Sequence, residues 1–165
     1  MSNAPNAQSF ANVSGTLILA GAGKMGGALL TGWLAQGLDA RQVAVIEPHA
    51  SDEIRALAAK GVKLNPATGS VGPVAALVVA VKPQMFAEAA SQLKPLVGPG
   101  TLVVSIMAGT KIAALRAACG GAVVRAMPNT PAAIGRGITV AVAAQGVDAG
   151  QRSVADALLR ATGAV

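Results

Sequence analysis

Aromatic residues are nearly absent from this sequence, which has no tyrosine and only Phe10, Phe86 and Trp33. Nucleic-acid surfaces usually combine aromatic side chains with clustered cations, whereas the 13 Lys and Arg residues here are scattered along the chain. We therefore predict no nucleic-acid partner, although the net charge is +6 at pH 7. The basic balance is better interpreted as the surface of a protein that handles small anions.

Cysteine and histidine each occur once, as Cys119 and His49. A single cysteine excludes an internal disulfide and a thiolate cage around a metal ion. A single histidine excludes a multi-histidine metal site. The sequence therefore predicts a protein without a metal, in a reducing compartment.

Long apolar runs are also missing. No run reaches the roughly 20 residues that span a bilayer, and residues 1–15 lack the basic and apolar regions of a secretion signal. We therefore predict a soluble, cytoplasmic protein with no membrane partner. Residues 1–15 are expected to form a flexible leader.

What the chain does have is 53% hydrophobic residues and 20 glycines among 165 residues, enough for one well-packed domain over residues 16–165. Short apolar runs rich in branched residues predict strands, and they alternate with segments of helical spacing. Such alternation predicts an α/β fold, a Rossmann-like doubly wound and mostly parallel sheet with helices on both faces. The expected strands are 16–20, 43–47, 61–65, 76–81, 101–106, 122–127 and 138–144; the expected helices are 24–36, one after Ser51, 83–93, 110–120 and 150–162. Ser51, Thr110 and Asp148 are the expected N-caps.

A glycine-rich turn, "GAGKMG", joins the first expected strand to the first expected helix. Gly21, Gly23 and Gly26 have the G-x-G-x-x-G spacing in which glycines allow a tight turn, approach of a pyrophosphate and close helix–strand packing. Lys24 adds a cation inside the loop. Glycines in any tight turn can imitate this pattern, so the interpretation depends on its context.

Glu47 supplies that context, because it ends the second expected strand where an acidic residue binds the adenosine ribose in NAD-binding folds. A carboxylate there repels a 2′-phosphate and favours NAD over NADP. His49, Ser51 and Arg55 follow closely and could accommodate a phosphate. NADP and NAD therefore both remain open as the cofactor.

Three further motifs follow expected strands: "AVKPQ" (80–84), "SIMAG" (105–109) and "RAMPNTPAAIGRG" (125–137). The carboxyl ends of strands in such sheets form one edge, where ligands bind. Together with the glycine loop, these motifs closely resemble those of pyrroline-5-carboxylate reductases, in the same order and at compatible spacing. The resemblance covers about residues 16–165, the amino-terminal half of a family member.

This resemblance implies NAD(P)H-dependent reduction of L-Δ1-pyrroline-5-carboxylate to L-proline, the last step of proline biosynthesis. It implies that three residues lie near the substrate: Pro128, Asn129 and Thr130. The residues expected at the cofactor are Ala20, Gly21, Ala22, Gly23, Lys24, Met25, Gly26, Glu47, Thr68, Ala80, Val81, Lys82, Pro83, Ile106, Met107 and Ala108. Lys24 stands where the family usually has Asn, and Asn65 is an alternative to Thr68.

The resemblance also implies a helical carboxyl-terminal domain that carries the substrate motif and the dimer interface of a homo-oligomer. That domain is expected to be absent from this chain, whose end at Val165 we interpret as a domain boundary. We accordingly expect cofactor binding without a catalytic residue. Two alternatives stay open: a stand-alone dinucleotide-binding or sensor module, and a related dehydrogenase or deazaflavin-linked NADP reductase, against which the "MPNTP" segment argues.

Overall fold

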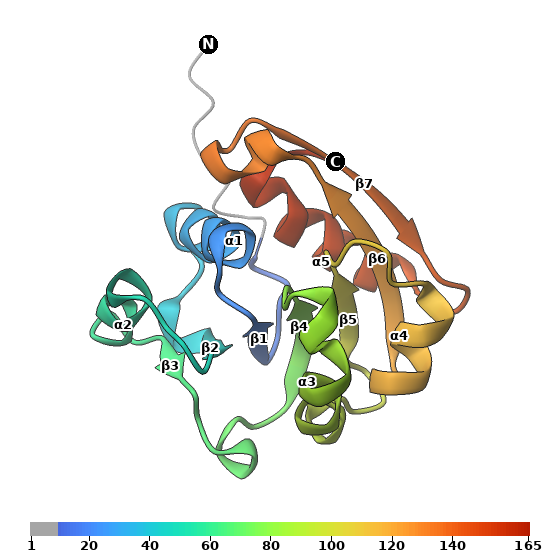
Figure 1. Cartoon of the computed structure of the whole chain (residues 1–165), viewed down its shortest axis with the longest axis horizontal. Helices are drawn as coiled ribbons and strands as arrows, with labels where there is room; N and C mark the ends of the chain where they lie inside the picture. The colour runs from blue at the N-terminus through green and yellow to red at the C-terminus, as the bar shows by residue number, and fades with distance from the viewer. Residues whose placement is uncertain (1–9) are drawn as a thin grey trace.

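The fold was obtained as a computed structural model, which describes residues 10–165. Figure 1 shows a central twisted sheet between layers of helices, as predicted from the sequence. Its strands are β1 (Thr16–Ala20), β2 (Val43–Ile46), β3 (Lys63–Leu64), β4 (Val74–Val79), β5 (Leu102–Ser105), β6 (Ala122–Pro128), β7 (Gly137–Ala143) and β8 (Gly163–Ala164). The helices are α1 (Lys24–Ala35), α2 (Asp52–Ala58), α3 (Phe86–Leu93), α4 (Ile112–Cys119) and α5 (Ala149–Leu159).

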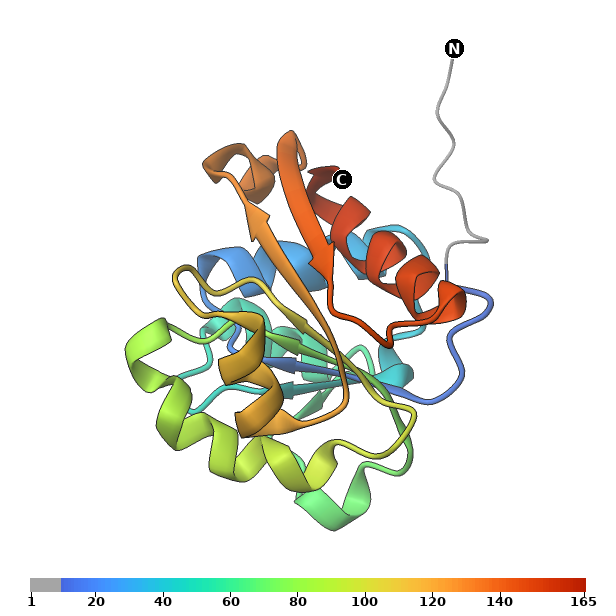
Figure 2. The same cartoon turned by 90° about the vertical axis from the view of Figure 1, so that its right-hand side faces the viewer.

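The strand order is β3-β2-β1-β4-β5-β6-β7-β8, and β1 to β6 are all parallel. In Figure 2, α1 and α5 lie on one side of the sheet and α3 and α4 on the other. The chain moves outward from β1 in one direction through β2 and β3, then crosses to β4 on the other side of β1. The doubly wound prediction is therefore confirmed, and β1 and β4 flank the point at which the strand order reverses.

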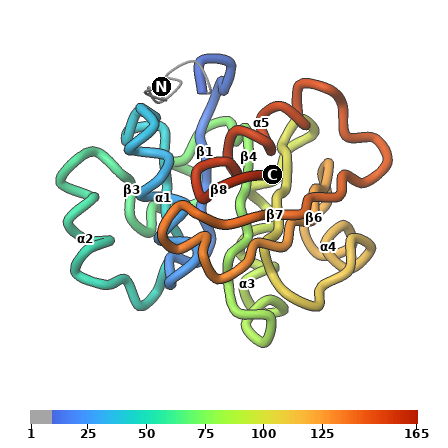
Figure 3. The backbone as a smooth tube through the Cα atoms, turned by 90° about the horizontal axis from the view of Figure 1, so that it is seen from above, coloured from blue at the N-terminus to red at the C-terminus, as the bar shows by residue number. Residues whose placement is uncertain are grey.

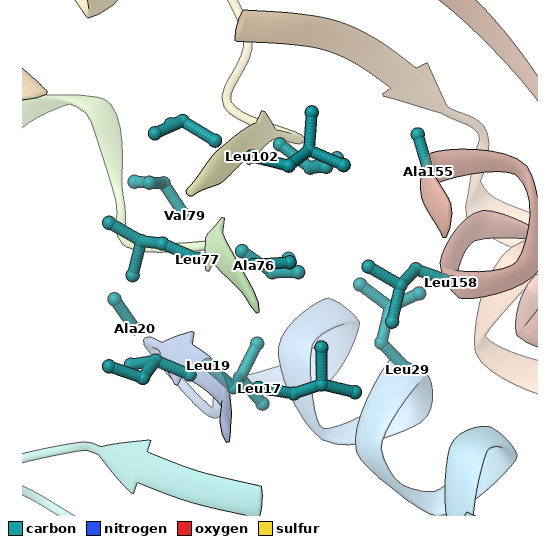
Figure 4. Close-up of a cluster of buried hydrophobic side chains, with 14 of the residues drawn as sticks. Leu17, Leu19, Ala20, Leu29, Ala76, Leu77, Val79, Leu102, Ala155 and Leu158 are labelled. Atoms are coloured by element: carbon teal, nitrogen blue, oxygen red, sulfur yellow. The ribbon is translucent and has the colours of Figure 1, made fainter. Parts of the chain in front are cut away.

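The core is built from aliphatic side chains, because the parallel strands are covered on both faces. All five residues of β1 are buried, and so are the last four residues of β4, 76–79. Figure 4 shows Leu29 of α1 beside Leu158 of α5, both over side chains of β1 and β4. Trp33 on α1 is fully buried, and its Nε1 donates a hydrogen bond to the Leu158 carbonyl at 2.9 Å. Trp33 therefore belongs to the core.

The far end of the sheet departs from the parallel pattern. β7 runs antiparallel to β6, and β8 then pairs parallel with β7, as the tube in Figure 3 shows beside the carboxyl terminus. The sequence pattern did not predict β8, which has two residues. A Cβ on Gly163 would overlap the backbone of Gly137, so only glycine allows this close pairing.

Two local expectations fail. Residues 10–15 were expected to belong to a flexible leader, but Phe10 and Val13 are buried in the core; residues 1–9 of that leader lie outside the described chain. Thr110 was expected to cap α4, but the N-cap is Lys111 and the Thr110 hydroxyl bonds to the Ala108 carbonyl instead. Within residues 10–165, no helix is both long and apolar enough to span a membrane.

Candidate dinucleotide-binding site

The three glycines of the loop after β1 lie in different surroundings. Gly21 has a φ of +89°, and a Cβ on it would lie 2.7 Å from the Ala80 carbonyl oxygen. A Cβ on Gly26 would overlap the carbonyl oxygen of Gly21, so helix and strand could not pack as they do. A Cβ on Gly23, in contrast, has no neighbour within 4 Å in the described chain. The first and third glycines thus serve packing, and the second leaves open space.

The open space at Gly23 adjoins the N-terminus of α1. Gly23 is the N-cap residue, and within the described chain no side chain caps this helix. The first amide groups of a helix have no intrahelical acceptor, and the helix dipole places about half a positive charge there. This arrangement fits an anionic group such as a pyrophosphate.

Glu47 follows β2 and is held against the loop by backbone hydrogen bonds. Its Oε2 accepts from the Ala22 amide at 2.8 Å, and its Oε1 accepts from the His49 amide at 3.0 Å. The side chain of Asn65 holds the Glu47 backbone, accepting from its amide at 2.8 Å and donating to its carbonyl at 2.9 Å. The Glu47 carboxylate therefore has a fixed position beside the glycine loop.

A cleft of about 1470 Å³ opens along the carboxyl ends of β1, β2 and β4. Of the residues predicted at the cofactor, it is lined by Ala20, Gly21, Ala22, Gly23, Lys24, Glu47, Ala80, Val81 and Lys82. Because Ala20 pairs in register with both Ile46 and Val79, the segments that follow these strands meet at one edge. This is the edge at which doubly wound sheets bind ligands.

Other predicted residues lie away from the cleft lining. Met25 and Gly26 lie in the first turn of α1, and Pro83 begins a short 3₁₀ turn, η3 (Pro83–Met85). Thr68 lines a separate hollow of about 220 Å³ together with Asn65. The remaining residues outside the lining are Ile106, Met107, Ala108, Pro128, Asn129 and Thr130. Asn129 instead accepts a hydrogen bond from the Ile138 amide at 2.8 Å, which fixes the start of β7.

The structure adds residues that the sequence argument missed. The turn η5 (Thr130–Ile134) packs against α1, and residues 132–135 form part of the cleft lining. Gln84, Met85 and Glu88 of the α3 region line it as well. Residues 132–135 belong to the "MPNTPAAIGRG" segment, so the sequence motif did indicate this part of the chain. The residues selected from it, 128–130, were not the ones that line the cleft.

Residues 10–165 contain no cluster of three His, Cys, Asp or Glu residues that could hold a metal ion. Cys119 is buried on α4, outside the cleft lining, and burial raises the pKa of its thiol. A buried thiol with a raised pKa is a poor nucleophile.

Fold and site together define a dinucleotide-binding domain of the doubly wound class. The chain belongs to the family described as "NADP oxidoreductase coenzyme F420-dependent", whose model matches residues 16–109. It is thus a member of an oxidoreductase family, and the prediction of NADP or NAD as cofactor is confirmed at the level of that family, whose description names NADP.

Individual relatives are more specific than the family description. The chain is 37% identical to pyrroline-5-carboxylate reductase from Haemophilus influenzae over 150 residues, which make up 87% of this chain and 54% of that protein. It is 38% identical to the reductase of the same name from Pseudomonas aeruginosa, with the same coverage. The predicted resemblance is confirmed, and the chain spans about half the length of these relatives.

Solved structures give the same picture of the fold. A pyrroline-5-carboxylate reductase from Coxiella burnetii matches with a TM-score of 0.82 and 27% identity, over 92% of this chain and 57% of that one. A pyrroline carboxylate reductase from Plasmodium falciparum, solved with NADP bound, matches with a TM-score of 0.76 at 21% identity, over 92% of this chain and 56% of that one.

Proposed function

We propose that this chain is the cofactor-binding half of a pyrroline-5-carboxylate reductase, which reduces L-Δ1-pyrroline-5-carboxylate to L-proline. The observation that carries the proposal is the "MPNTPAAIGRG" segment (127–137), because its turn η5 packs against α1 and its residues 132–135 line the cleft. The family model ends at residue 109 and so does not extend to this segment. The reductase relatives match 87% of the chain, a share too long to leave the segment out.

When bound, a reduced nicotinamide would supply the hydride for the carbon of the C=N bond, and the nitrogen would take up a proton from the solvent. The chain's own residues bind and orient. The amide groups at the start of α1 hold the anionic part of the dinucleotide, and Gly23 leaves room for it. Alignment of donor and acceptor can account for roughly 7–11 kcal/mol of a barrier in model systems. We assign no catalytic residue and no metal to this chain.

Three further statements belong to this proposal. Pro128, Asn129 and Thr130 lie toward the substrate, at the carboxyl end of β6. The reductase is a cytoplasmic homo-oligomer with a small-molecule substrate, and it binds neither nucleic acid nor a membrane. Scattered cations, few aromatics and a single cysteine support the location and the absence of a nucleic-acid partner.

The experiment compares the 165-residue chain with the same chain joined in frame to the carboxyl-terminal half of the Haemophilus influenzae reductase. Oxidation of NADH and NADPH is followed with L-Δ1-pyrroline-5-carboxylate, and a small 2-hydroxy acid with the oxidised cofactors serves as the comparison substrate. We expect both forms to bind dinucleotide in calorimetry and only the fusion to turn over the imine. A fusion carrying Gly23→Val is the inactive control.

Two outcomes contradict the proposal. If the 165-residue chain binds neither dinucleotide, the cleft is not a cofactor site. If a fusion that melts cooperatively and binds cofactor reduces no imine, the chain belongs to a different reductase or is a binding module. Turnover of the 2-hydroxy acid would favour the related dehydrogenases.

A further inference from the structure

The Glu47 carboxylate is a fixed negative charge at the ribose end of the cleft. Both of its oxygens accept backbone hydrogen bonds, from Ala22 and His49, so the group cannot turn away without breaking them. The end of the second strand is the position from which an acidic side chain accepts a hydrogen bond from the ribose 2′-hydroxyl in this class of fold. Each carboxylate oxygen has a second lone pair with which to accept another hydrogen bond.

Asn65 fixes the backbone of Glu47 through hydrogen bonds. The Asn65 side chain accepts a hydrogen bond from the backbone amide of Glu47 and donates one to the Glu47 carbonyl. The backbone amide of Asn65 donates to the Val45 carbonyl at 2.7 Å. Asn65 has a φ of 46°, a left-handed conformation that asparagine tolerates better than most residues. The backbone of Glu47 is thereby tied to the segment that follows β3.

A second carboxylate lies at this end of the cleft, and the side chain of His49 lines it as well. Glu53 of α2 also lines the cleft there, whereas Arg55, on the same helix, lies outside the lining. The lysines in the lining, Lys24 and Lys82, belong to the glycine loop and to the segment after β4. The hydroxyl oxygen of Ser51, also in the lining, accepts from the Ile54 amide as the N-cap of α2, which leaves its O–H as an uncharged donor.

A 2′-phosphate carries about 1.5 to 2 negative charges at pH 7, since the second pKa of a phosphate monoester is about 6. Like charges in contact disfavour a complex, and the effect is larger where solvent is partly excluded. We propose that this chain selects NADH over NADPH, with Glu47 as the residue that determines the choice. The inference rests on the proposed function and departs from the family description, which names NADP.

Calorimetric titration of the 165-residue chain with NADH and with NADPH tests the inference. We expect NADH to bind at least tenfold more tightly, which corresponds to about 1.4 kcal/mol. Glu47→Gln removes the charge and keeps one acceptor oxygen. It should therefore lower the ratio of the NADPH to the NADH dissociation constant, chiefly by improving NADPH binding. Asp52→Asn is the matched control, because Asp52 is a nearby acidic residue at the start of α2 that lies outside the cleft lining; this substitution leaves the affinity ratio unchanged.

A measurement on the unaltered chain covers the case of a variant that does not fold. Adenosine 2′,5′-bisphosphate should displace NADH less effectively than 5′-AMP, and the difference should shrink at high salt. Equal or tighter binding of NADPH overturns the inference, and so does a folded Glu47→Gln chain with an unchanged ratio. Failure to bind either dinucleotide overturns the proposed function instead.

Discussion

At the scale of single residues, the glycines of the loop after β1 have different roles although they look alike in the sequence. Gly26 faces the backbone of Gly21, and Gly23 faces open space in the cleft. The spacing of the motif predicts both, because each role follows from the turn between β1 and α1. The hydrogen bonds of Asn65 to Glu47 could not be predicted, since they join residues 18 positions apart whose proximity depends on the pairing of β2 and β3.

These different surroundings predict that alanine at Gly26 mainly lowers stability, whereas alanine at Gly23 mainly lowers the affinity for NADH. Gly26→Ala overpacks the contact between α1 and β1 and should cost about 3 kcal/mol or more. Gly23→Ala should cost less than about 1 kcal/mol, the size of an N-cap effect, while lowering the affinity for NADH at least tenfold. Thermal melting and calorimetric titration of both variants check this. Equal destabilisation by the two substitutions would contradict the assignment of their roles.

At the scale of elements, the helices with local start signals were predicted best. Ser51 and Asp148 cap α2 and α5 as expected, because an N-cap needs only residues close in sequence. The segment 61–65 was expected as a full strand, but β3 has two residues, since only Ala44 and Val45 of β2 pair with it. The direction of β7 and the existence of β8 depend on contacts with distant segments, which periodicity does not encode.

Asp148 provides the test at this scale. Its side chain accepts from the Gln151 amide at 2.8 Å, and the Gln151 side chain accepts from the Asp148 amide at 3.1 Å, which completes a capping box. Asp148→Ala removes the carboxylate and should lower the free energy of unfolding by about 1 kcal/mol. Urea denaturation measures it, with the exposed Asp52→Ala as comparison. A change below the error of the fit would show that this cap contributes nothing.

At the scale of the whole molecule, one face of the sheet carries exposed apolar side chains. Ile138, Val140 and Val142 alternate along β7 and are 62%, 66% and 53% exposed. Met127 of β6, which pairs in register with Val140, is 47% exposed. An apolar area of this kind is unusual on the surface of a soluble monomer and promotes association. The sequence predicted a strand here but not which of its faces would remain uncovered.

A charged residue in this face should therefore change the behaviour of the chain in solution. Val140→Lys should reduce concentration-dependent association, measured by sedimentation velocity, and leave NADH affinity unchanged because Val140 does not line the cleft. Ser153→Lys adds the same charge at an exposed position on α5 and is the control. A chain that sediments as a monomer at every concentration, with or without the substitution, would contradict this prediction.

The burial of Trp33 has an optical consequence. With no tyrosine in the sequence and one tryptophan, the near-ultraviolet emission of the folded chain comes from this indole. Trp33 lies on the helix that begins at the glycine loop, nine residues after Lys24, or about 14 Å along the helix axis. Indole emission overlaps the absorption band of a reduced nicotinamide and not that of an oxidised one. In the proposed complex this helix would hold the pyrophosphate at one end and carry, near its other end, a donor for resonance energy transfer that reports the redox state of the bound dinucleotide.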